Sequence, residues 1–266
     1  MTYNDQLNRT VILNKIPKRI ISLVPSQTEL LVDLGLESVI VGVTKFCIHP
    51  NTIRKSAGVV GGTKQVNLQK IKDLHPDLIL CNKEENTKEM IASMATIAPI
   101  HISDVYNLND CFELIHMYGD LFNVEAKALE LIQAIAKERN RFKLLKQPII
   151  KVAYFIWKNP WMVVASDNFI DEMLSEAGFV NVFKDQKRYP IIELNSPLLK
   201  EADVVLLSSE PFPFSAQDVL EFKTQCPETL IKIVDGELFS WYGSRLLQSY
   251  TYFNGLRNAI KKSIFP

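Results

Sequence analysis

Large aromatic rings and one basic group stand just after short apolar runs in this sequence. The residues are Phe46, Trp157, Trp241, Tyr242 and Arg245. Core aromatics are expected inside periodic apolar stripes, so rings beyond the ends of such runs are candidates for binding. Rings on rigid strand ends offer apolar area with little entropy to lose, which suits a bulky, partly planar ligand. Rings that merely close the edge of a core are the alternative.

A mixed metal site is a second chemical hypothesis. His49 follows an apolar run beside Cys47, and it could meet Cys81 or Glu84 from the end of the next such run. Together they would offer nitrogen, sulfur and oxygen ligands. The alternative is a loop histidine bonded to backbone. We expect no resident metal, no cofactor and no catalytic residue, because nucleophile-elbow, dinucleotide and phosphate-loop motifs do not occur.

Charge and hydropathy narrow the class of protein. Lys+Arg and Asp+Glu both number 30, so the basic surface that nucleic acid requires is not indicated. The apolar runs fall well short of the roughly 20 residues needed to cross a bilayer, so no transmembrane segment is expected. The four cysteines stand far apart, which favours free thiols. The first residues lack the features of a secretory signal, which favours the cytoplasm.

Apolar runs alternate with helical patterns in the first half of the chain. Strands are expected at 19–26, 39–43, 78–82 and 99–103, with helices between them at 27–35, 67–75 and 87–98. This order predicts a parallel sheet, in which ligands bind beyond the carboxyl ends of the strands. Ser26 and Glu29 have the spacing of a capping box, and Gly61 with Gly62 predicts a tight turn.

Residues 124–145 carry apolar side chains at helical spacing without Gly or Pro, which predicts one helix of about 30 Å. The alternation then restarts, with strands at 150–157, 204–208 and 231–235 and helices at 169–178 and 244–260. We therefore expect an α/β fold of two Rossmann-like lobes with parallel sheets. Its parts are a first lobe (1–122), a bridging helix (123–146) and a second lobe (147–266). A buried helix inside one domain is the alternative.

A weak internal repeat supports this division. IKDLHPDLILCNKEE can be laid on PLLKEADVVLLSSEP, which places Asp77 over Asp203 and Glu84 over Glu210. Chance similarity is the alternative, because any passage from a helix to a strand has a similar pattern.

Longer segments carry a resemblance to a known family. They are RIISLVPSQTELLVDLG, VGVTKF with HP after it, NLQKIKDLHPDLIL, DNFIDEMLSEAGFVNVF with KRYP after it, and FSWYGSR. In this order, over residues 17–262, the chain resembles the periplasmic cobalamin- and siderophore-binding proteins of ABC importers. The resemblance implies two α/β lobes joined by one long backbone helix. It also implies a monomer that holds a metal chelate, namely a corrinoid, a haem-like group or a ferric siderophore, in the cleft between the lobes.

Site residues follow from the same resemblance. Four residues match positions that line the cleft in cobalamin-binding relatives: Phe46, Trp157, Tyr189 and Arg245. Thr63 and Lys64 lie where those relatives present an aromatic ring, so this part of the expected ligand site differs from theirs. Lys64 and Arg245 are suited to carboxylates or phosphate on the periphery of a chelate.

The resemblance further implies an ABC permease as partner and a periplasmic location, against the cytoplasmic location that the chain's first residues favour. Relatives that deliver cargo carry one carboxylate on each lobe for the permease, whereas Gln69 and Asn195 stand at those positions here, which leaves docking open. Two other functions stay open. One is a chelatase-like enzyme acting on a tetrapyrrole, with His49 as base and Glu84 as metal guide; the other is direct binding of a transition metal by Cys47, His49 and an acid.

Overall fold

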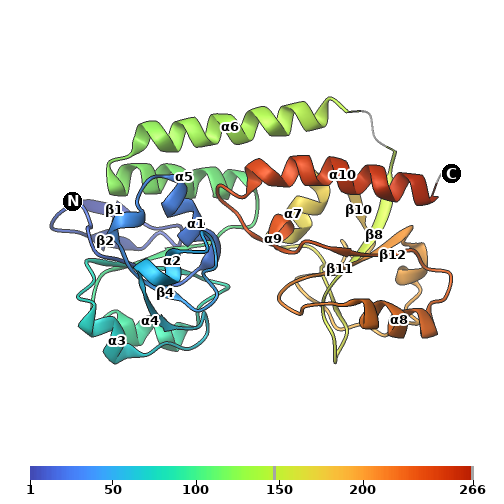
Figure 1. Ribbon diagram of the computed structural model, residues 1–266, viewed down its shortest axis with the longest axis horizontal. Coiled ribbons are helices and arrows are strands. Elements are labelled where there is room, and N and C mark those ends of the chain that lie inside the picture. Colours follow the sequence, from blue (N-terminus) through green and yellow to red (C-terminus); the bar gives the residue numbers. More distant parts are fainter. Residues whose placement is uncertain (146–147, 265–266) are drawn as a thin grey trace. The chain divides into compact units, whose positions relative to one another are not determined.

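The computed structural model describes residues 1–145 and 148–264, and within them the chain forms two compact units (Figure 1). The first unit holds Met1–Ile135 and the short segment Tyr242–Arg245. The second unit holds Ala136–Trp241 and the chain from Leu246 onward. Residues 146, 147 and 266, where the sequence predicted lobe boundaries, lie outside the described residues.

The first unit is built on a five-stranded parallel sheet with the spatial order β5-β4-β3-β6-β7. Its strands are β3 (Ile20–Ser22), β4 (Ile40–Thr44), β5 (Gly58–Gly61), β6 (Leu78–Asn82) and β7 (Ile100–Ser103). The chain adds β4 and β5 on one side of β3, and then β6 and β7 on the other side. The strand order therefore reverses between β3 and β6, and open α/β sheets bind ligands at such a reversal.

Helices cover both faces of this sheet. Their bounds are α1 (Pro25–Asp33), η1 (Glu37–Val39), α2 (Ile53–Ser56), α3 (Leu68–Asp73), α4 (Lys88–Met94) and α5 (Leu108–Phe122). Ile71 of α3 and Met90 of α4 pack with Ile79 of β6 in the core of one face. On the other face, Tyr118 of α5 contacts the ring of His101 in β7. Burial of apolar side chains on both faces is typical of parallel sheets and explains their continuous apolar runs.

The predicted capping box at Ser26 and Glu29 is wrong. Helix α1 begins at Pro25, with Val24 as its N-cap residue and no side-chain cap. Proline suits this first position because its φ is preset for a helix and it has no N–H group to satisfy. The predicted turn at Gly61 and Gly62 is confirmed, since Gly61 has a φ of 144° and Gly62 N donates to Gln65 O at 2.7 Å.

A small hairpin of β1 (Thr2–Asn4) and β2 (Thr10–Ile12) was not predicted from the sequence. Its turn protects the outer edge of β7. Asp5 accepts from Ile102 N at 3.1 Å, Arg9 donates to Ile100 O at 2.9 Å, and Gln6 accepts from Asp104 N at 3.0 Å. Side chains thus satisfy backbone groups that would otherwise offer an open sheet edge.

The second unit has a parallel sheet with the spatial order β10-β8-β11-β12, and β9 pairs antiparallel with β8. Its strands are β8 (Ile150–Trp157), β9 (Met162–Val163), β10 (Phe179–Asn181), β11 (Val204–Ser208) and β12 (Ile231–Val234). The order reverses between β8 and β11. The predicted α/β class with parallel sheets is therefore confirmed, with β9 as an antiparallel addition.

Helices also flank this second sheet. Their bounds are α7 (Phe169–Glu176), η2 (Leu198–Glu201), α8 (Ala216–Gln225), α9 (Glu237–Ser240) and α10 (Leu246–Ile264). Phe222 of α8 packs with Phe155 and Leu207 on one face. On the other face, Phe239 of α9 contacts Tyr154 of β8 and Phe253 of α10. Two apolar layers therefore enclose the strands.

The internal repeat has a structural counterpart. Asp77 accepts from Lys18 N at 2.9 Å, and its own N–H donates to Arg19 O at 2.8 Å. Asp203 accepts from Lys151 N at 2.7 Å and donates through its N–H to Lys151 O at 2.9 Å. Each aspartate therefore links two neighbouring strands at the point where the strand order reverses. Asp77 links the start of β6 to the start of β3, and Asp203 links the start of β11 to β8.

Helix α6 (Glu125–Lys143) confirms the long helix predicted at 124–145, and the division between the units falls within it, after Ile135. Its bridging role stays a prediction. Among the described residues, we find no helix with the length and apolar character required to cross a membrane.

Candidate functional site

The first edge, defined as the carboxyl ends of β3 to β7 with the loops that follow them, is organised by two asparagines. Asn82 Oδ1 accepts from Glu84 N at 2.8 Å and from Glu85 N at 3.0 Å. Asn86 Oδ1 accepts from Asn82 N at 2.9 Å, so the turn 83–86 is closed from both ends. Both amides are buried. The turn after β6 is therefore held in one conformation.

Asn86 also joins this turn to its neighbours. Its Nδ2 donates to Thr63 O at 2.8 Å, in the loop after β5, and to Leu23 O at 3.5 Å, after β3. Lys64 Nζ donates to Glu84 O at 2.6 Å. Three loops at the strand-order reversal are thus tied together, which is the rigidity that a binding site needs.

Phe46 is an exposed ring on this edge. It follows β4, is 48% exposed, and lies 5.0 Å below the ammonium group of Lys45. A Cβ atom added to Gly62 would come within 3.3 Å of the ring, so Phe46 rests against the loop that carries Thr63 and Lys64. The structure therefore brings these three predicted residues to one side of the first edge.

Tyr242 occupies the interior of the first edge. Its hydroxyl accepts from Gln27 Nε2 at 2.9 Å and lies 3.3 Å from Ser103 Oγ. Gln27 in turn accepts from the Tyr118 hydroxyl at 2.7 Å. Burial is the main factor that raises the pKa of Tyr242. This tyrosine is 6% exposed, so it supports the edge from beneath.

Arg245 and Gly243 secure the same segment. Arg245 Nε pairs with Glu29 Oε2 at 2.9 Å, and Gly243 N donates to Cys111 Sγ at 3.2 Å. Burial raises the pKa of Glu29, and the neighbouring Arg245 opposes that shift. The predicted role of Arg245 as a ligand contact stays a prediction, beside this structural ion pair.

The three metal candidates lie in different environments. Cys47 is fully buried, with its thiol 3.1 Å from Thr28 Oγ1 and 3.3 Å from Thr44 Oγ1. Burial raises the pKa of this thiol, which disfavours the thiolate that binds metals. His49 is half-buried and Glu84 is exposed. Within residues 1–145 and 148–264, no three His, Cys, Asp or Glu side chains gather in the manner of a metal site.

The second edge, defined as the carboxyl ends of β8 and β10 to β12 with the loops that follow them, is aromatic. Trp157 ends β8, is 40% exposed, and makes an edge contact with Phe212 at 5.7 Å between ring centroids. Phe212 lies 4.7 Å from Phe214, which stacks on Trp161 at 6.1 Å. An exposed ring is therefore backed by a row of others.

Lys158 links the aromatic residues of the second edge to α8. Its ammonium group bonds to Asp218 at 2.8 Å and to Glu221 at 2.6 Å, and it lies 5.7 Å from the centre of the Trp161 ring. Burial would raise the pKa of Asp218, but hydrogen bonds from Lys158 and Ser215 outweigh it and lower that pKa to about 2. The second edge is thus braced by charge as well as by ring contacts.

Trp241 and Tyr189 complete the predicted set. Trp241 is 7% exposed and donates through Nε1 to Glu210 Oε1 at 2.9 Å. Ser240 Oγ donates to the same carboxylate oxygen. Tyr189 is half-buried, with the Arg188 guanidinium 5.3 Å from its ring centre. Trp241 is therefore mostly enclosed, whereas Trp157 offers ring surface to solvent.

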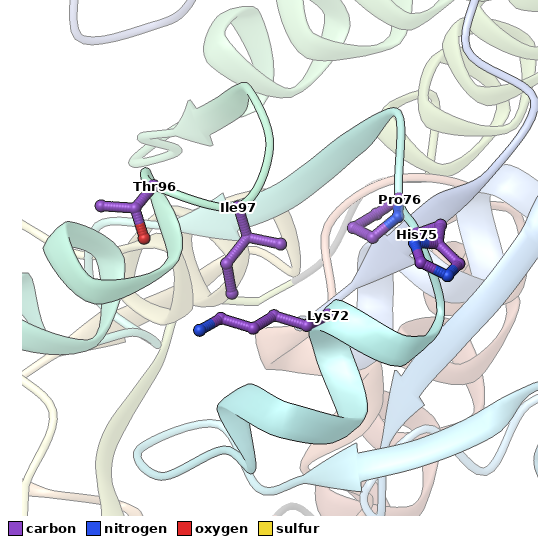
Figure 2. A pocket seen from close by; sticks show the side chains of 5 residues that line it. All are labelled: Lys72, His75, Pro76, Thr96 and Ile97. Atoms are coloured by element: carbon purple, nitrogen blue, oxygen red, sulfur yellow. The ribbon is translucent and has the colours of Figure 1, made fainter.

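A shallow pocket lies at the opposite end of the first sheet, before β6 and β7. Figure 2 shows its lining residues: Lys72, His75, Pro76, Thr96 and Ile97. Parallel sheets bind ligands at the carboxyl ends of their strands, so each of the two edges, and not this pocket, is a candidate site.

Sequence reasoning missed the groups that organise the first edge. Gln27 and Asn86 were not singled out, and Asn82 was noted only as a residue at a strand end, although an asparagine at the end of an apolar strand is a signal for a side-chain-capped turn. Gln27 carries no local signal, because its partner Tyr242 is 215 residues away.

Comparison with known proteins agrees with this architecture. The chain is 28% identical over 221 residues to an uncharacterized ABC transporter substrate-binding lipoprotein of Bacillus subtilis, covering 77% of this chain and 70% of the relative. It is 26% identical over 196 residues to a vitamin B12-binding protein of Vibrio cholerae, covering 72% and 70%.

A solved structure from Staphylococcus epidermidis, described as a possible iron-binding periplasmic solute-binding protein, has the same fold. Its TM-score is 0.78 at 22% identity, covering 92% of this chain and 99% of that one. The family described as periplasmic binding protein matches residues 20–232 of the present sequence. The chain has two α/β units, each with a parallel sheet in which the strand order reverses, and it belongs to the periplasmic binding protein family.

Proposed function

We propose that this chain binds a metal chelate without transforming it and presents the chelate to an ABC importer. The chelate is a corrinoid, a haem-like group or a ferric siderophore. Family membership supports a substrate-binding role, because its members serve transport. The organised loops of the first edge and the exposed rings of the second supply groups suited to a large, partly planar ligand.

The observation that carries the proposal is Trp157. A tryptophan that is 40% exposed at a strand end, with Phe212 packed edge-on against it, presents a rigid apolar face. Such rings dominate the free energy of many binding sites. Phe46 is a second exposed ring, and it follows a strand end of the first sheet. Both match positions that the family resemblance assigns to ligand contact.

A corrinoid is the leading ligand within this class. The vitamin B12-binding protein of Vibrio cholerae is a relative whose alignment covers 72% of this chain. A corrinoid also combines a broad face with amide and phosphate groups on its periphery, and Lys64 at the first edge offers a cation to the phosphate.

We infer an ABC permease as partner and a site of action outside the cytoplasm, because relatives carry the names of ABC transporter lipoproteins and of vitamin B12-binding proteins. Gln69 and Asn195 are both exposed, and Gln69 bonds to Asp73 at 2.7 Å. A carboxylate therefore lies one helical turn from Gln69 and is available for docking in its place.

The test is titration of the purified protein with cyanocobalamin, hemin and a ferric hydroxamate siderophore, followed by tryptophan quenching and by calorimetry. We expect saturable binding of at least one chelate at a 1:1 ratio. Titration with zinc and ferrous salts, together with a metal-insertion assay on protoporphyrin, separates the other functional classes. Saturable binding of a bare metal alone, or turnover of the tetrapyrrole, would contradict the proposal.

A further inference from the structure

Glu85 is a carboxylate at the first edge that receives no hydrogen bond from residues 1–145 or 148–264. The residue follows β6 and is half-buried, and its backbone N–H is fixed by Asn82 Oδ1 at 3.0 Å. Among the residues that the structure describes, none donates a hydrogen bond to its side chain. Its carboxylate oxygens are not among the fully buried polar atoms without a partner, so they stay open to solvent and to a hydrogen-bond donor of a ligand.

The contrast with the second edge makes this feature specific. In the internal repeat, Glu210 stands in the turn after β11 as Glu84 stands in the turn after β6. The Glu210 carboxylate receives hydrogen bonds from Trp241 and Ser240 within the protein. The acidic residue of the second turn is thus bonded within the protein. The first turn carries one carboxylate more, Glu85, whose position in the repeat is taken by Pro211 at the second edge.

The surroundings of Glu85 define what it would accept. Lys64, Glu84, Cys47 and Tyr242 are the titratable groups that interact with it electrostatically. Burial raises the pKa of Glu85, Lys64 opposes that shift, and Glu84 adds to it. The ammonium group of Lys64 is anchored on Glu84 O at 2.6 Å, so the cation and the carboxylate stand in one rigid turn assembly.

We propose that Glu85 is a specificity-determining residue that accepts a hydrogen bond from an N–H group of the ligand, while Lys64 beside it receives an anionic group. This inference rests on the proposed function and narrows it. A corrinoid fits, because it carries side-chain amides and a phosphate. A haem does not fit, because its periphery carries carboxylates and no N–H donor, and Glu85 would repel them.

The experiment compares the wild type with Glu85→Gln by calorimetric titration with cyanocobalamin and with hemin. Glutamine keeps the shape of the side chain and can still accept through its amide oxygen, but it removes the charge. We expect cyanocobalamin to bind Glu85→Gln about tenfold more weakly than wild type, since a charged acceptor becomes neutral. Hemin affinity is expected to rise in the same variant.

Glu89→Gln is the matched control, because Glu89 is an exposed carboxylate in the first turn of α4. It makes the same change of charge in the same unit, and we expect wild-type affinities for both ligands. Circular dichroism and a urea midpoint confirm that Glu85→Gln is folded.

A corrinoid with one side-chain amide hydrolysed to a carboxylate gives a second measurement. If that amide meets Glu85, the derivative binds the wild type poorly and regains affinity in Glu85→Gln. We expect at least one of the monocarboxylate isomers to behave in this way.

Two outcomes would overturn the inference. The first is that Glu85→Gln binds cyanocobalamin as tightly as the wild type does. The second is that the wild type binds hemin more tightly than cyanocobalamin. Either result leaves the proposed function standing, because a chelate is still bound. A wild type that binds none of the chelates refutes the proposed function itself, and the inference with it.

Discussion

The two sheet edges occupy equivalent places, at the carboxyl ends of parallel strands, but they carry different side chains. At the first edge, the Asn86 amide and the Lys64 ammonium group tie three loops together, and Glu85 lies in one of these loops. At the second edge, rings pack in a row behind the exposed Trp157. From this difference we expect the first edge to discriminate between polar groups of a ligand, and the second edge to offer apolar contact area.

The largest effect is expected from Gln27→Leu at the first edge. This change leaves the hydroxyls of Tyr118, Tyr242 and Ser103 without their shared amide partner. Three buried polar groups then lose hydrogen bonds, so the free energy of unfolding should fall by about 3 kcal/mol or more. The measurement is urea unfolding. Gln133→Leu, at an exposed position on α6, is the control, and an equal loss in both variants would argue against the network.

Trp157→Ala at the second edge should affect ligand binding more than stability. Losing the exposed ring should weaken chelate binding by about 30-fold, or about 2 kcal/mol. The free energy of unfolding should change by less than about 1 kcal/mol, since much of the ring is already hydrated. Leu220→Ala on α8, which is 61% exposed, is the matched control. Equal chelate affinity of Trp157→Ala and wild type would contradict the role of the second edge in binding.

Acidification should weaken corrinoid binding through the first edge. A ligand N–H group binds the carboxylate form of Glu85, whose pKa in the free protein is raised by burial. Affinity is therefore full above that raised pKa and falls as the pH drops through it, by up to about tenfold. Titrations from pH 8 to pH 5 measure this dependence. Glu85→Gln should show a flat profile, and a profile as steep as that of the wild type would assign the proton to another group.

The smallest effect is expected from Asp218→Asn, beneath the second edge. The pKa of Asp218 is lowered to about 2, below the value near 3.9 of an unfolded aspartate. Its contribution to stability is therefore full above about pH 4 and is lost as the pH falls toward 2. The variant should lose about 1 kcal/mol at pH 7, and the difference from wild type should shrink in acid. Glu221→Gln, at a more exposed partner of Lys158, should cost less.

Local pattern was sufficient for most of the framework. The limits of β6, β8 and β11 agree with the predicted runs, because a strand buried on both faces is continuously apolar and stops where polar residues begin. Strand β5 was missed because Gly58 and Gly61 give it little β propensity. The start of α1 was misplaced because Ser26 followed by Glu29 imitates a capping box that Pro25 makes unnecessary.

The candidate site was less accessible to sequence reasoning because its order depends on distant pairs. Trp157 and Phe46 were predicted from strand ends, and both are exposed there. Tyr242 was also predicted as a ligand contact, but its hydroxyl meets Gln27 from the other end of the chain. No local pattern shows such a pairing. That no described residue donates to the carboxylate of Glu85 is likewise visible only once the neighbouring donors have been placed.

The most direct test of the central claim is a fluorescence titration of the wild type and Trp157→Phe with cyanocobalamin. We expect saturable quenching in the wild type, at a stoichiometry of one, and a clear loss of both affinity and quenching amplitude in the variant. Quenching that is linear in cyanocobalamin, or identical in the two proteins, would contradict the claim that the chain binds a chelate against this ring.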